Sequence, residues 1–338
     1  AYEKGAIVSR VAKSFLRFGN FELFAARNDL KNLKILTDYT ILHHFSHLGN
    51  PCKEVYLKFF QEVTNKTLEM IVHWQRVGFV HGVMNTDNMS ILGLTIDYGP
   101  YGWLEGFDLG WTPNTTDKKH KRYRYGNQPT IGLWNLYQLA NALYPLIDEA
   151  PPLEEILERY QLDFKTESIH MMRSKLGLNL AKKNDLLLIE SLEKNLQASE
   201  TDMTIFFRKL SDFKKEFPEQ GIKLVENAFY KIDEIHDNLL NNWQQWFSEY
   251  AKRLKEEPIP FSERQKKMNK VNPKYILRNY MAQLAIDKAE INDSSLIEEL
   301  YQILKKPYEE QPEFEHWFAK RPEWARHKVG CSMLSCSS

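Results

Sequence analysis

Apolar residues recur at helical spacing through much of the chain. Between Val55 and Val77 they stand three, four or seven residues apart, at Phe59, Val63, Met70, Trp74 and Val77. This spacing places them on one face of a long amphipathic helix. Gly78 follows, and glycine is common directly after a helix C-terminus. We therefore predict a helix that ends before Gly78 and buries one face.

The same periodicity returns after Pro129. It predicts helices over residues 134–146, 153–162, 166–176, 185–196, 202–213, 241–254 and 273–289. Asp185 and Asp202 are predicted N-caps, because a short carboxylate side chain can accept the free N–H groups of a first turn. Tryptophans at helical spacing are predicted core residues, at Trp74, Trp134, Trp243 and Trp246. The predicted fold class is mainly α.

Signals for β structure are few. Residues 5–11 have the composition of a strand, and residues 90–97 indicate a short hairpin around Gly93. Residues 98–128 are rich in Gly, Pro, Asn and aromatic residues without periodicity, and a loop of that length in a folded protein is usually functional or mobile. The tail beyond Pro307 is expected to be irregular. A small β element is therefore expected around residues 81–97.

Composition narrows the class of protein. Lys plus Arg equals Asp plus Glu, at 45 each, so no net charge attracts nucleic acid or anionic lipid. No apolar run approaches the roughly 18 residues of a membrane span. Three cysteines are too few for a disulfide framework, which favours a reducing compartment. We expect a cytoplasmic protein, or a mitochondrial one in a eukaryote, that binds neither nucleic acid nor membrane.

The most informative stretch begins at His81. The order is a helix, the loop from His81 to Asn88, a predicted hairpin and then Asp97-Tyr98-Gly99. Protein kinases arrange H-R-D-x-x-x-x-N, a hairpin and D-F-G in this order, with the same seven-residue step from His to Asn. The Asn and the D-F-G Asp of kinases hold Mg²⁺ against ATP phosphates. Asn88 and Asp97 are therefore candidate magnesium ligands.

One position departs from the kinase pattern. Val83 stands where a kinase places its catalytic Asp, and a valine side chain cannot orient or deprotonate a hydroxyl. Asp87, directly before Asn88, is the nearest carboxylate. Either the catalytic carboxylate stands at another position in this protein, or the protein has no catalytic activity. Two alternatives stay open: a small-molecule phosphotransferase of the aminoglycoside-kinase type, which Val83 argues against, and a non-catalytic pseudokinase that binds nucleotide or a partner as a scaffold.

Four stretches closely resemble the selenoprotein O family, namely residues 79–102, 127–136, 272–280 and 336–338. The resemblance implies a protein-kinase-like C-lobe with a helical C-terminal extension, here residues 1–150 and 151–338. It implies that the protein binds ATP and transfers AMP to Ser, Thr or Tyr hydroxyls of other proteins. It also implies an N-terminal lobe ahead of Ala1, so we expect the chain to be a C-terminal fragment lacking most of that lobe.

Residue roles follow from the same resemblance. Asp87 matches the catalytic base, and Asn88 and Asp97 match the ligands of Mg²⁺, or of Mn²⁺ in its place. Arg10 and Arg17 match two arginines that contact the phosphates of ATP, and Asp97 is assigned to the same nucleotide site. Guanidinium groups suit phosphate binding because they offer two parallel donors to phosphate oxygens. His81 is expected to brace the loop by hydrogen bonds.

The C-terminal cysteines are a further expectation from the resemblance. Family members carry selenocysteine or cysteine three residues from the end, in some cases paired with a cysteine in the loop after D-Y-G. Cys336 holds the terminal position here, but residues 98–128 contain no cysteine. Cys331 is therefore the nearer candidate partner for a redox-sensitive disulfide, with two simple reduced thiols as the alternative.

Overall fold

The long amphipathic helix predicted from the apolar pattern is present as α3 (Lys53–Val77). It ends at the predicted place because Gly78 follows with a φ of +74°, a left-handed backbone that glycine adopts without steric cost. The helices α4 (Gln128–Ile147) and α5 (Pro151–Lys175) come later in the chain. The computed structural model describes residues 7–328, 331 and 334.

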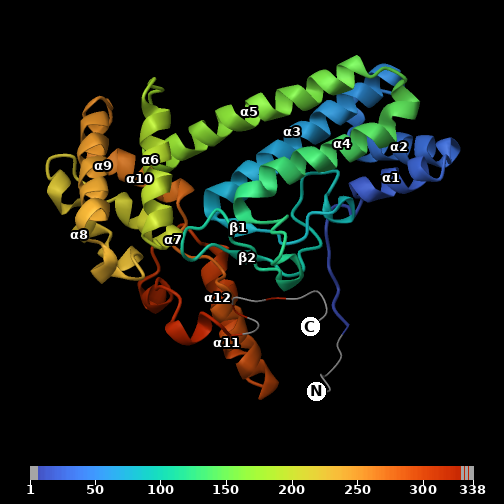
Figure 1. The fold of residues 1–338 in the computed structure, drawn as a ribbon. Coiled ribbons are helices and arrows are strands. Elements are labelled where there is room, and N and C mark those ends of the chain that lie inside the picture. Colours follow the sequence, from blue (N-terminus) through green and yellow to red (C-terminus); the bar gives the residue numbers. More distant parts are fainter. Residues whose placement is uncertain (1–6, 329–330, 332–333, 335–338) are drawn as a thin grey trace. The chain divides into compact units, whose positions relative to one another are not determined.

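The chain divides into two units. Figure 1 labels the helices and strands from which they are built. Unit 1 is drawn from Ala1–Thr67, Asn85–Asp97 and Trp134–Leu157, and unit 2 from Leu68–Met84, Tyr98–Leu133 and Glu158–Ser338. Three of the boundaries fall within α3, α4 and α5, and the other two fall in loops, after Met84 and after Asp97. All five residues predicted to carry the chemistry belong to unit 1.

Unit 1 is built on an aromatic core. Besides its parts of α3, α4 and α5 it contains α1 (Phe18–Ala26), α2 (Leu30–His44), and the 3-10 turns η1 (Ser46–Leu48) and η2 (Thr86–Asn88). Phe21, Phe45 and Phe59 are fully buried. The ring of Phe59 lies 5.0 Å from that of Phe45, edge to face, and 6.2 Å from that of Phe21. The buried Phe21 therefore fixes α1 on this core.

Unit 2 holds the only sheet among the described residues. Its strands are β1 (Phe79–Val80) and β2 (Gly102–Trp103), which pair antiparallel with Phe79 opposite Trp103. Its helices are α6 (Asp185–Ala198), α7 (Met203–Leu210), α8 (Gly221–Leu224), α9 (Asp237–Lys255), α10 (Phe261–Val271), α11 (Asn279–Glu290) and α12 (Ser295–Lys305). The 3-10 turns are η3 (Thr115–Asp117), η4 (Tyr125–Asn127), η5 (Pro218–Gln220), η6 (Glu226–Ala228), η7 (Ile232–Glu234), η8 (Pro312–Trp317) and η9 (Glu323–Ala325). The protein is thus mainly helical with a small antiparallel sheet, as predicted.

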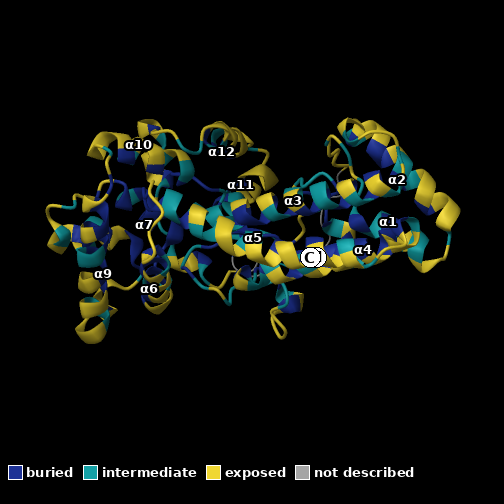
Figure 2. Cartoon of the chain, turned by 90° about the horizontal axis from the view of Figure 1, so that it is seen from above, coloured by how far each residue is buried: buried dark blue, intermediate teal, exposed yellow. Residues whose placement is uncertain are grey.

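Two hydrophobic clusters stabilise unit 2. The larger includes residues of α6, α7 and α9, helices with many buried positions in Figure 2, and contains the buried Trp243 and Trp246. The smaller joins α11 and α12 to the irregular tail through Trp317. Asp202 is the N-cap of α7, as predicted, because its carboxylate accepts the N–H of Ile205 at 3.0 Å.

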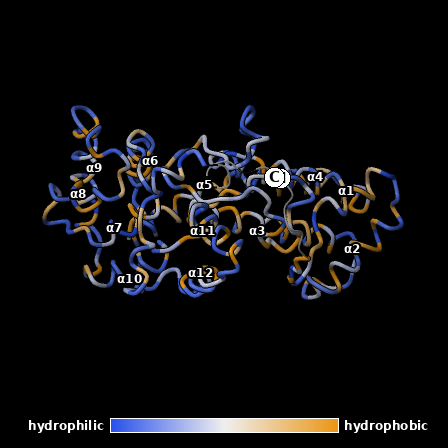
Figure 3. The backbone as a smooth tube through the Cα atoms, turned by 90° about the horizontal axis from the view of Figure 1, so that it is seen from below, coloured by the Kyte–Doolittle hydropathy of each residue, from blue (hydrophilic) through white to orange (hydrophobic). Residues whose placement is uncertain are grey.

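Hydrophobic and hydrophilic positions are interleaved along the helices (Figure 3). Within the part of the chain that the structure describes, no helix combines the length and the apolar character that crossing a membrane would require.

The predicted β elements at residues 5–11 and 90–97 are wrong wherever the structure describes them. Residues 7–11 form no strand, and Ile7 is completely exposed. Residues 90–97 form no hairpin: Ser90 forms a single bridge with Arg17, a turn follows at residues 91–92, and residues 93–97 are irregular. The reason lies at Gly93, where a Cβ atom would stand 2.9 Å from the Lys66 carbonyl oxygen. The segment packs against α3 and does not fold back on itself.

Three smaller predictions also need correction. Residues 153–162 and 166–176 belong to one helix, α5, because residues 163–165 between them contain no glycine or proline that would break it. Asn184, and not Asp185, is the N-cap of α6. Trp134 is 38% exposed, so it is not a core residue, whereas Trp74, Trp243 and Trp246 are buried.

Candidate functional site

Backbone hydrogen bonds tie the start of α1 to the loop after the His81 motif. The N–H of Phe18 donates to the carbonyl of Met89 at 3.0 Å, and the N–H of Ile91 donates to the carbonyl of Leu16 at 3.0 Å. Between them, Arg17 forms an antiparallel bridge with the loop. Residues about seventy positions apart in sequence are therefore held in fixed register.

This bridge holds Arg17 against Asp97. Arg17 Nε lies 2.5 Å from Asp97 Oδ2, and Arg10 Nη1 lies 3.8 Å from Asp97 Oδ1. The Asp97 side chain is 21% exposed, that of Arg17 32% and that of Arg10 55%. Two guanidinium groups around one carboxylate leave one surplus positive charge among the three groups. That surplus, still open to solvent, favours an anionic ligand.

The backbone at Asp97 is unusual. Its φ is +52°, in the left-handed region that costs most side chains about 1 kcal/mol or more and that Asp tolerates better than most. Asp97 Oδ2 is buried and accepts no hydrogen bond of good geometry within the described part of the chain. Its close neighbour is the Arg17 guanidinium, whose Nε lies 2.5 Å away, so this oxygen is held by an ion pair.

Asp87 and Asn88 lie in η2, beside α1. The N–H of Asn88 donates to the carbonyl of Asn85 at 2.9 Å, which closes the turn. Asp87 is exposed, and its carboxylate lies directly against the backbone of Gly19 in α1. A Cβ atom added to Gly19 would stand 2.1 Å from Asp87 Oδ1. The side chain of Asp87 thus occupies the space that any other residue at position 19 would fill.

His81 and Gly82 lie in unit 2 and have structural roles. His81 is completely buried, and its Nδ1 accepts the N–H of Val83 at 3.4 Å. Its backbone N–H donates to Gln128 Oε1 at 3.0 Å. This confirms the expected bracing of the loop. Gly82 has a φ of +82°, and a Cβ atom there would stand 2.2 Å from the Pro100 carbonyl oxygen, so glycine is required at this position.

The structure brings some of the predicted site residues together. Arg10, Arg17 and Asp97 form one ion-pair cluster, and Asp87 contacts the first turn of α1, which begins directly after Arg17. Sequence analysis missed the contribution of Gly19. A helix over residues 18–26 could have been predicted from the spacing of the apolar positions, but nothing local indicates that its glycine faces Asp87.

The donor set at this site fits a hard cation only in part. Within residues 7–328, 331 and 334, no three His, Cys, Asp or Glu side chains gather as a metal site. The amide of Asn88 and the carboxylate of Asp97 offer two oxygen ligands. Mg²⁺ is typically bound by one or two protein oxygens with nucleotide phosphates and water completing its octahedron. The assignment of Asn88 and Asp97 as ligands of Mg²⁺ therefore stays a prediction.

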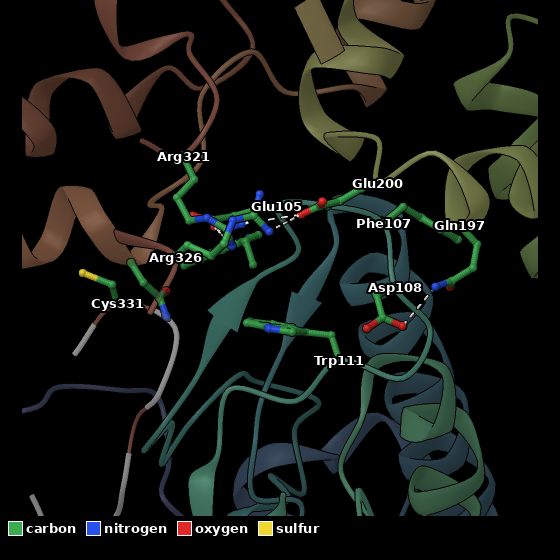
Figure 4. A pocket seen from close by; sticks show the side chains of 12 residues that line it. Glu105, Phe107, Asp108, Trp111, Gln197, Glu200, Arg321, Arg326 and Cys331 are labelled. Atoms are coloured by element: carbon green, nitrogen blue, oxygen red, sulfur yellow. Dashed lines mark hydrogen bonds and ion pairs between the residues drawn. The ribbon is translucent and has the colours of Figure 1, made fainter. Parts of the chain in front are cut away.

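Unit 2 contains a cavity of about 360 Å³ that sequence analysis did not predict (Figure 4). Its wall carries paired charges: Arg321 Nη1 lies 2.8 Å from Glu105 Oε2, and Arg326 Nη1 lies 2.6 Å from Glu200 Oε1. Burial raises the pKa of the Glu105 carboxyl. Asp108 also lines the cavity, so its wall carries three carboxylates and two guanidinium groups.

Cys331 also lines this cavity. It is 4% exposed, and burial raises the pKa of its thiol. The expected partner, Cys336, lies outside the described residues, so the predicted disulfide stays a prediction.

The fold and the site define a mainly helical protein with a phosphate-suited arginine–carboxylate cluster beside a motif loop of kinase order. Comparison with known proteins identifies the family to which the chain belongs. The profile of the family described as protein adenylyltransferase SelO matches residues 1–305. The chain belongs to this family, as its motifs indicated.

Curated relatives agree over the whole chain. A protein nucleotidyltransferase YdiU of Flavobacterium johnsoniae is 60% identical over 100% of the chain, and one of Rhodopirellula baltica is 51% identical over 100%. A third, from Aromatoleum aromaticum, is 51% identical over 99%. The chain spans 65%, 66% and 64% of the lengths of these three relatives.

Proposed function

We propose that the protein of full family length that carries this chain transfers AMP from ATP to Ser, Thr or Tyr hydroxyls of other proteins. The reaction needs Mg²⁺, or Mn²⁺ in its place, and releases pyrophosphate. Residues 1–150 belong to a kinase-like core, and residues 151–338 form its helical extension. The observation that supports this proposal most directly is that Arg10 and Arg17 contact the Asp97 carboxylate, while Asp87 lies against the first turn of α1, the helix that follows Arg17. Family membership supports the reaction type.

Arg10 and Arg17 bind the phosphates in this proposal. Each guanidinium now contacts the Asp97 carboxylate, with the closer pair at 2.5 Å. Phosphate oxygens compete for the same donors, because a guanidinium can serve a carboxylate and a phosphate through different N–H groups. The exposed half of Arg10 leaves room for that second partner.

Asn88 and Asp97 are the residues that would hold the metal ion. When bound, Mg²⁺ neutralises phosphate charge and so favours departure of pyrophosphate. Asp97 contributes the charged ligand and Asn88 the neutral one. The backbone of Asp97 is left-handed, with a φ of +52°, and backbone conformations of this kind are found more often at functional sites than elsewhere.

Asp87 acts as the general base. It accepts the proton of the attacking hydroxyl while that oxygen bonds to the α-phosphorus and the bond from the α-phosphorus to the bridging oxygen breaks. Val83 stands at the position from which a kinase carboxylate acts, and it offers no acceptor. The exposed position of Asp87 suits a base that must meet a hydroxyl on another protein.

Substitution of Asp87 tests this proposal in the full-length protein. Asp87→Ala and Asp87→Asn should each lower the rate of AMP transfer by about 10²- to 10⁴-fold, the usual contribution of a general base. The affinity for Mg-ATP should change little, because Asp87 is not among the phosphate or metal ligands. Asp163→Ala, at a surface helix position far along the chain, is the matched control. Wild-type turnover in either Asp87 variant would refute the role of base.

A further inference from the structure

We propose that α1 is the element that positions the catalytic base, with Gly19 and Glu22 as positioning residues for Asp87. This inference rests on the proposed function and adds two residues to its machinery. Nothing in the motif pattern assigns them, because they lie more than sixty positions from the loop on which they act.

Gly19 provides the surface against which the carboxylate of Asp87 rests. A Cβ atom at position 19 would lie 2.1 Å from Asp87 Oδ1 and 3.0 Å from Asp87 Cγ. Real Cβ atoms do not approach other atoms so closely, so any larger residue must displace the carboxylate or the turn. Only glycine lets the carboxylate keep its present position.

Glu22 holds the residue before the base. Thr86 Oγ1 donates a hydrogen bond of 2.6 Å to Glu22 Oε2, and Thr86 is buried. Gly19 and Glu22 are three positions apart and therefore share one face of α1. That face meets two consecutive residues of η2, Thr86 and Asp87. The helix thus fixes both the backbone of the turn, through Thr86, and the direction of the base, through Gly19.

The same helix start also carries the phosphate cluster. Arg17 precedes α1 as its N-cap, bonded through its backbone N–H to Asn20 Oδ1 at 2.9 Å, while its side chain contacts Asp97. One short, rigid element therefore sets the base and the arginine relative to each other. Catalysis depends on such spacing, because a misplacement of about 1 Å can cost about 10²-fold in rate.

A positioning role and a purely structural role for Gly19 predict different behaviour of the Gly19→Ala variant. If Gly19 positions the base, the variant should stay stable, because alanine is the better helix former and the nearest atom it meets belongs to an exposed carboxylate that can turn toward solvent. The Gly19→Ala variant should therefore keep or raise its Tm while it loses catalysis. If Gly19 merely allowed packing, Tm and activity would fall together.

Two substitutions test the proposal in the full-length protein. We expect Gly19→Ala to lower kcat by about 10²-fold, with Tm not reduced and the Kd for Mg-ATP unchanged. We expect Thr86→Val to lower kcat by about tenfold, as loss of a supporting hydrogen bond commonly does, and Thr86→Ser to restore it.

The controls separate positioning from folding. Gly132→Ala places a methyl group 2.2 Å from Ile71 Cδ1 inside the core, so it should lower Tm and reduce activity only through the loss of folded protein. Thr40→Val removes another buried hydroxyl, one that bonds the Leu36 carbonyl of its own helix at 2.7 Å, and should leave kcat unchanged.

The outcomes decide the matter. A fall in kcat with Tm and Mg-ATP affinity retained supports the proposal. Wild-type kcat in Gly19→Ala, or a loss that tracks Tm as in Gly132→Ala, overturns it. If the wild-type protein transfers no AMP, the proposed function fails, and a crystal structure of Gly19→Ala decides instead. An Asp87 carboxylate turned away from α1 then supports positioning by Gly19, and an unmoved carboxylate overturns it.

Discussion

Asp97 combines three properties that rarely meet in one residue. Its backbone is left-handed, its carboxylate contacts two arginines, and one buried oxygen receives no well-formed hydrogen bond among the described residues. The ion pair with the arginines accounts for the position of the carboxylate, and the role of Asp97 as a metal ligand is part of the proposed function.

Asp97→Ala tests this assignment. We expect the Mg²⁺-dependent part of ATP affinity to fall by about tenfold or more, because a contact to a charged ligand contributes roughly 1.5–3 kcal/mol. Calorimetric titration of the full-length protein with ATP, in the presence and absence of Mg²⁺, measures it. An unchanged affinity for Mg-ATP would show that Asp97 is only the partner of Arg17.

The cysteines differ in burial and should differ in reactivity. Cys52 is exposed, whereas Cys331 is buried and burial raises the pKa of its thiol, so less thiolate is present and access is poorer. In a Cys336→Ser background under reductant, we expect iodoacetamide to modify Cys52 at least about tenfold faster than Cys331. Peptide mass spectrometry gives the two rates, and equal rates would contradict the buried position of Cys331.

The same assay tests the redox hypothesis. If Cys331 and Cys336 form a disulfide, oxidised protein should protect Cys331 from the reagent until reductant is added, and the Cys336→Ser variant should lose that protection. Identical labelling of both proteins with and without oxidant would end the hypothesis.

At the scale of elements, secondary structure could be predicted from the sequence where the apolar repeat extends over many helical turns. The helix α3 was predicted because five apolar residues repeat over 23 positions and a glycine follows. Asp202 was recognised as an N-cap because the signal is local. The hairpin at 90–97 failed because its β composition is overridden by contact with Lys66 on α3, which no local pattern reveals.

The candidate site shows the same division. His81, Asn88 and Asp97 follow one another in the order typical of kinases, so the candidate metal ligands could be predicted from the sequence. The roles given to Arg10 and Arg17 came only through family resemblance, since an arginine seventy residues away carries no local signal. Gly19 and Glu22 could not be found, because their contacts with η2 exist only once α1 is folded against it.

The helix α5 ends in a buried lysine, and burial disfavours the charged form of its side chain. Lys175, the last residue of α5, is buried, and its Nζ donates to the carbonyl of Arg76 at 2.7 Å. Burial and the Arg76 guanidinium lower the pKa of Lys175 well below its ordinary 10.5. Between the lowered pKa and 10.5 the unfolded chain binds the extra proton, so the stability of the folded chain should rise with pH.

Lys175→Met removes this dependence. As the pH rises toward 10.5, the free energy of unfolding of the wild-type chain should rise more steeply than that of the variant, by up to about 1.4 kcal/mol per pH unit. Urea titrations at several pH values measure both slopes, and the comparison of slopes is insensitive to the lost hydrogen bond. Parallel slopes would mean that Lys175 keeps its proton in the folded state.

At the scale of the whole molecule, the predicted chemistry gathers in one part of the chain. Arg10, Arg17, Asp87, Asn88 and Asp97 all belong to unit 1. The curated relatives are longer, since the chain spans 64–66% of their lengths. Activity therefore has to be measured in a protein of full family length, whereas the stability and labelling predictions apply to the chain itself.

The most direct test of the central claim asks which phosphorus atom of ATP is attacked. A kinase presents the γ-phosphoryl group and leaves ADP, whereas an adenylyltransferase presents the α-phosphorus and releases pyrophosphate. Full-length protein is incubated with Mg²⁺, a protein acceptor and ATP labelled at either the α or the γ phosphate. We predict that only the α label enters the acceptor, with a mass increase of one AMP, and that Asp87→Ala suppresses it. Transfer of the γ label would make the protein a phosphotransferase, and tight ATP binding without transfer of either label would make it a pseudokinase scaffold.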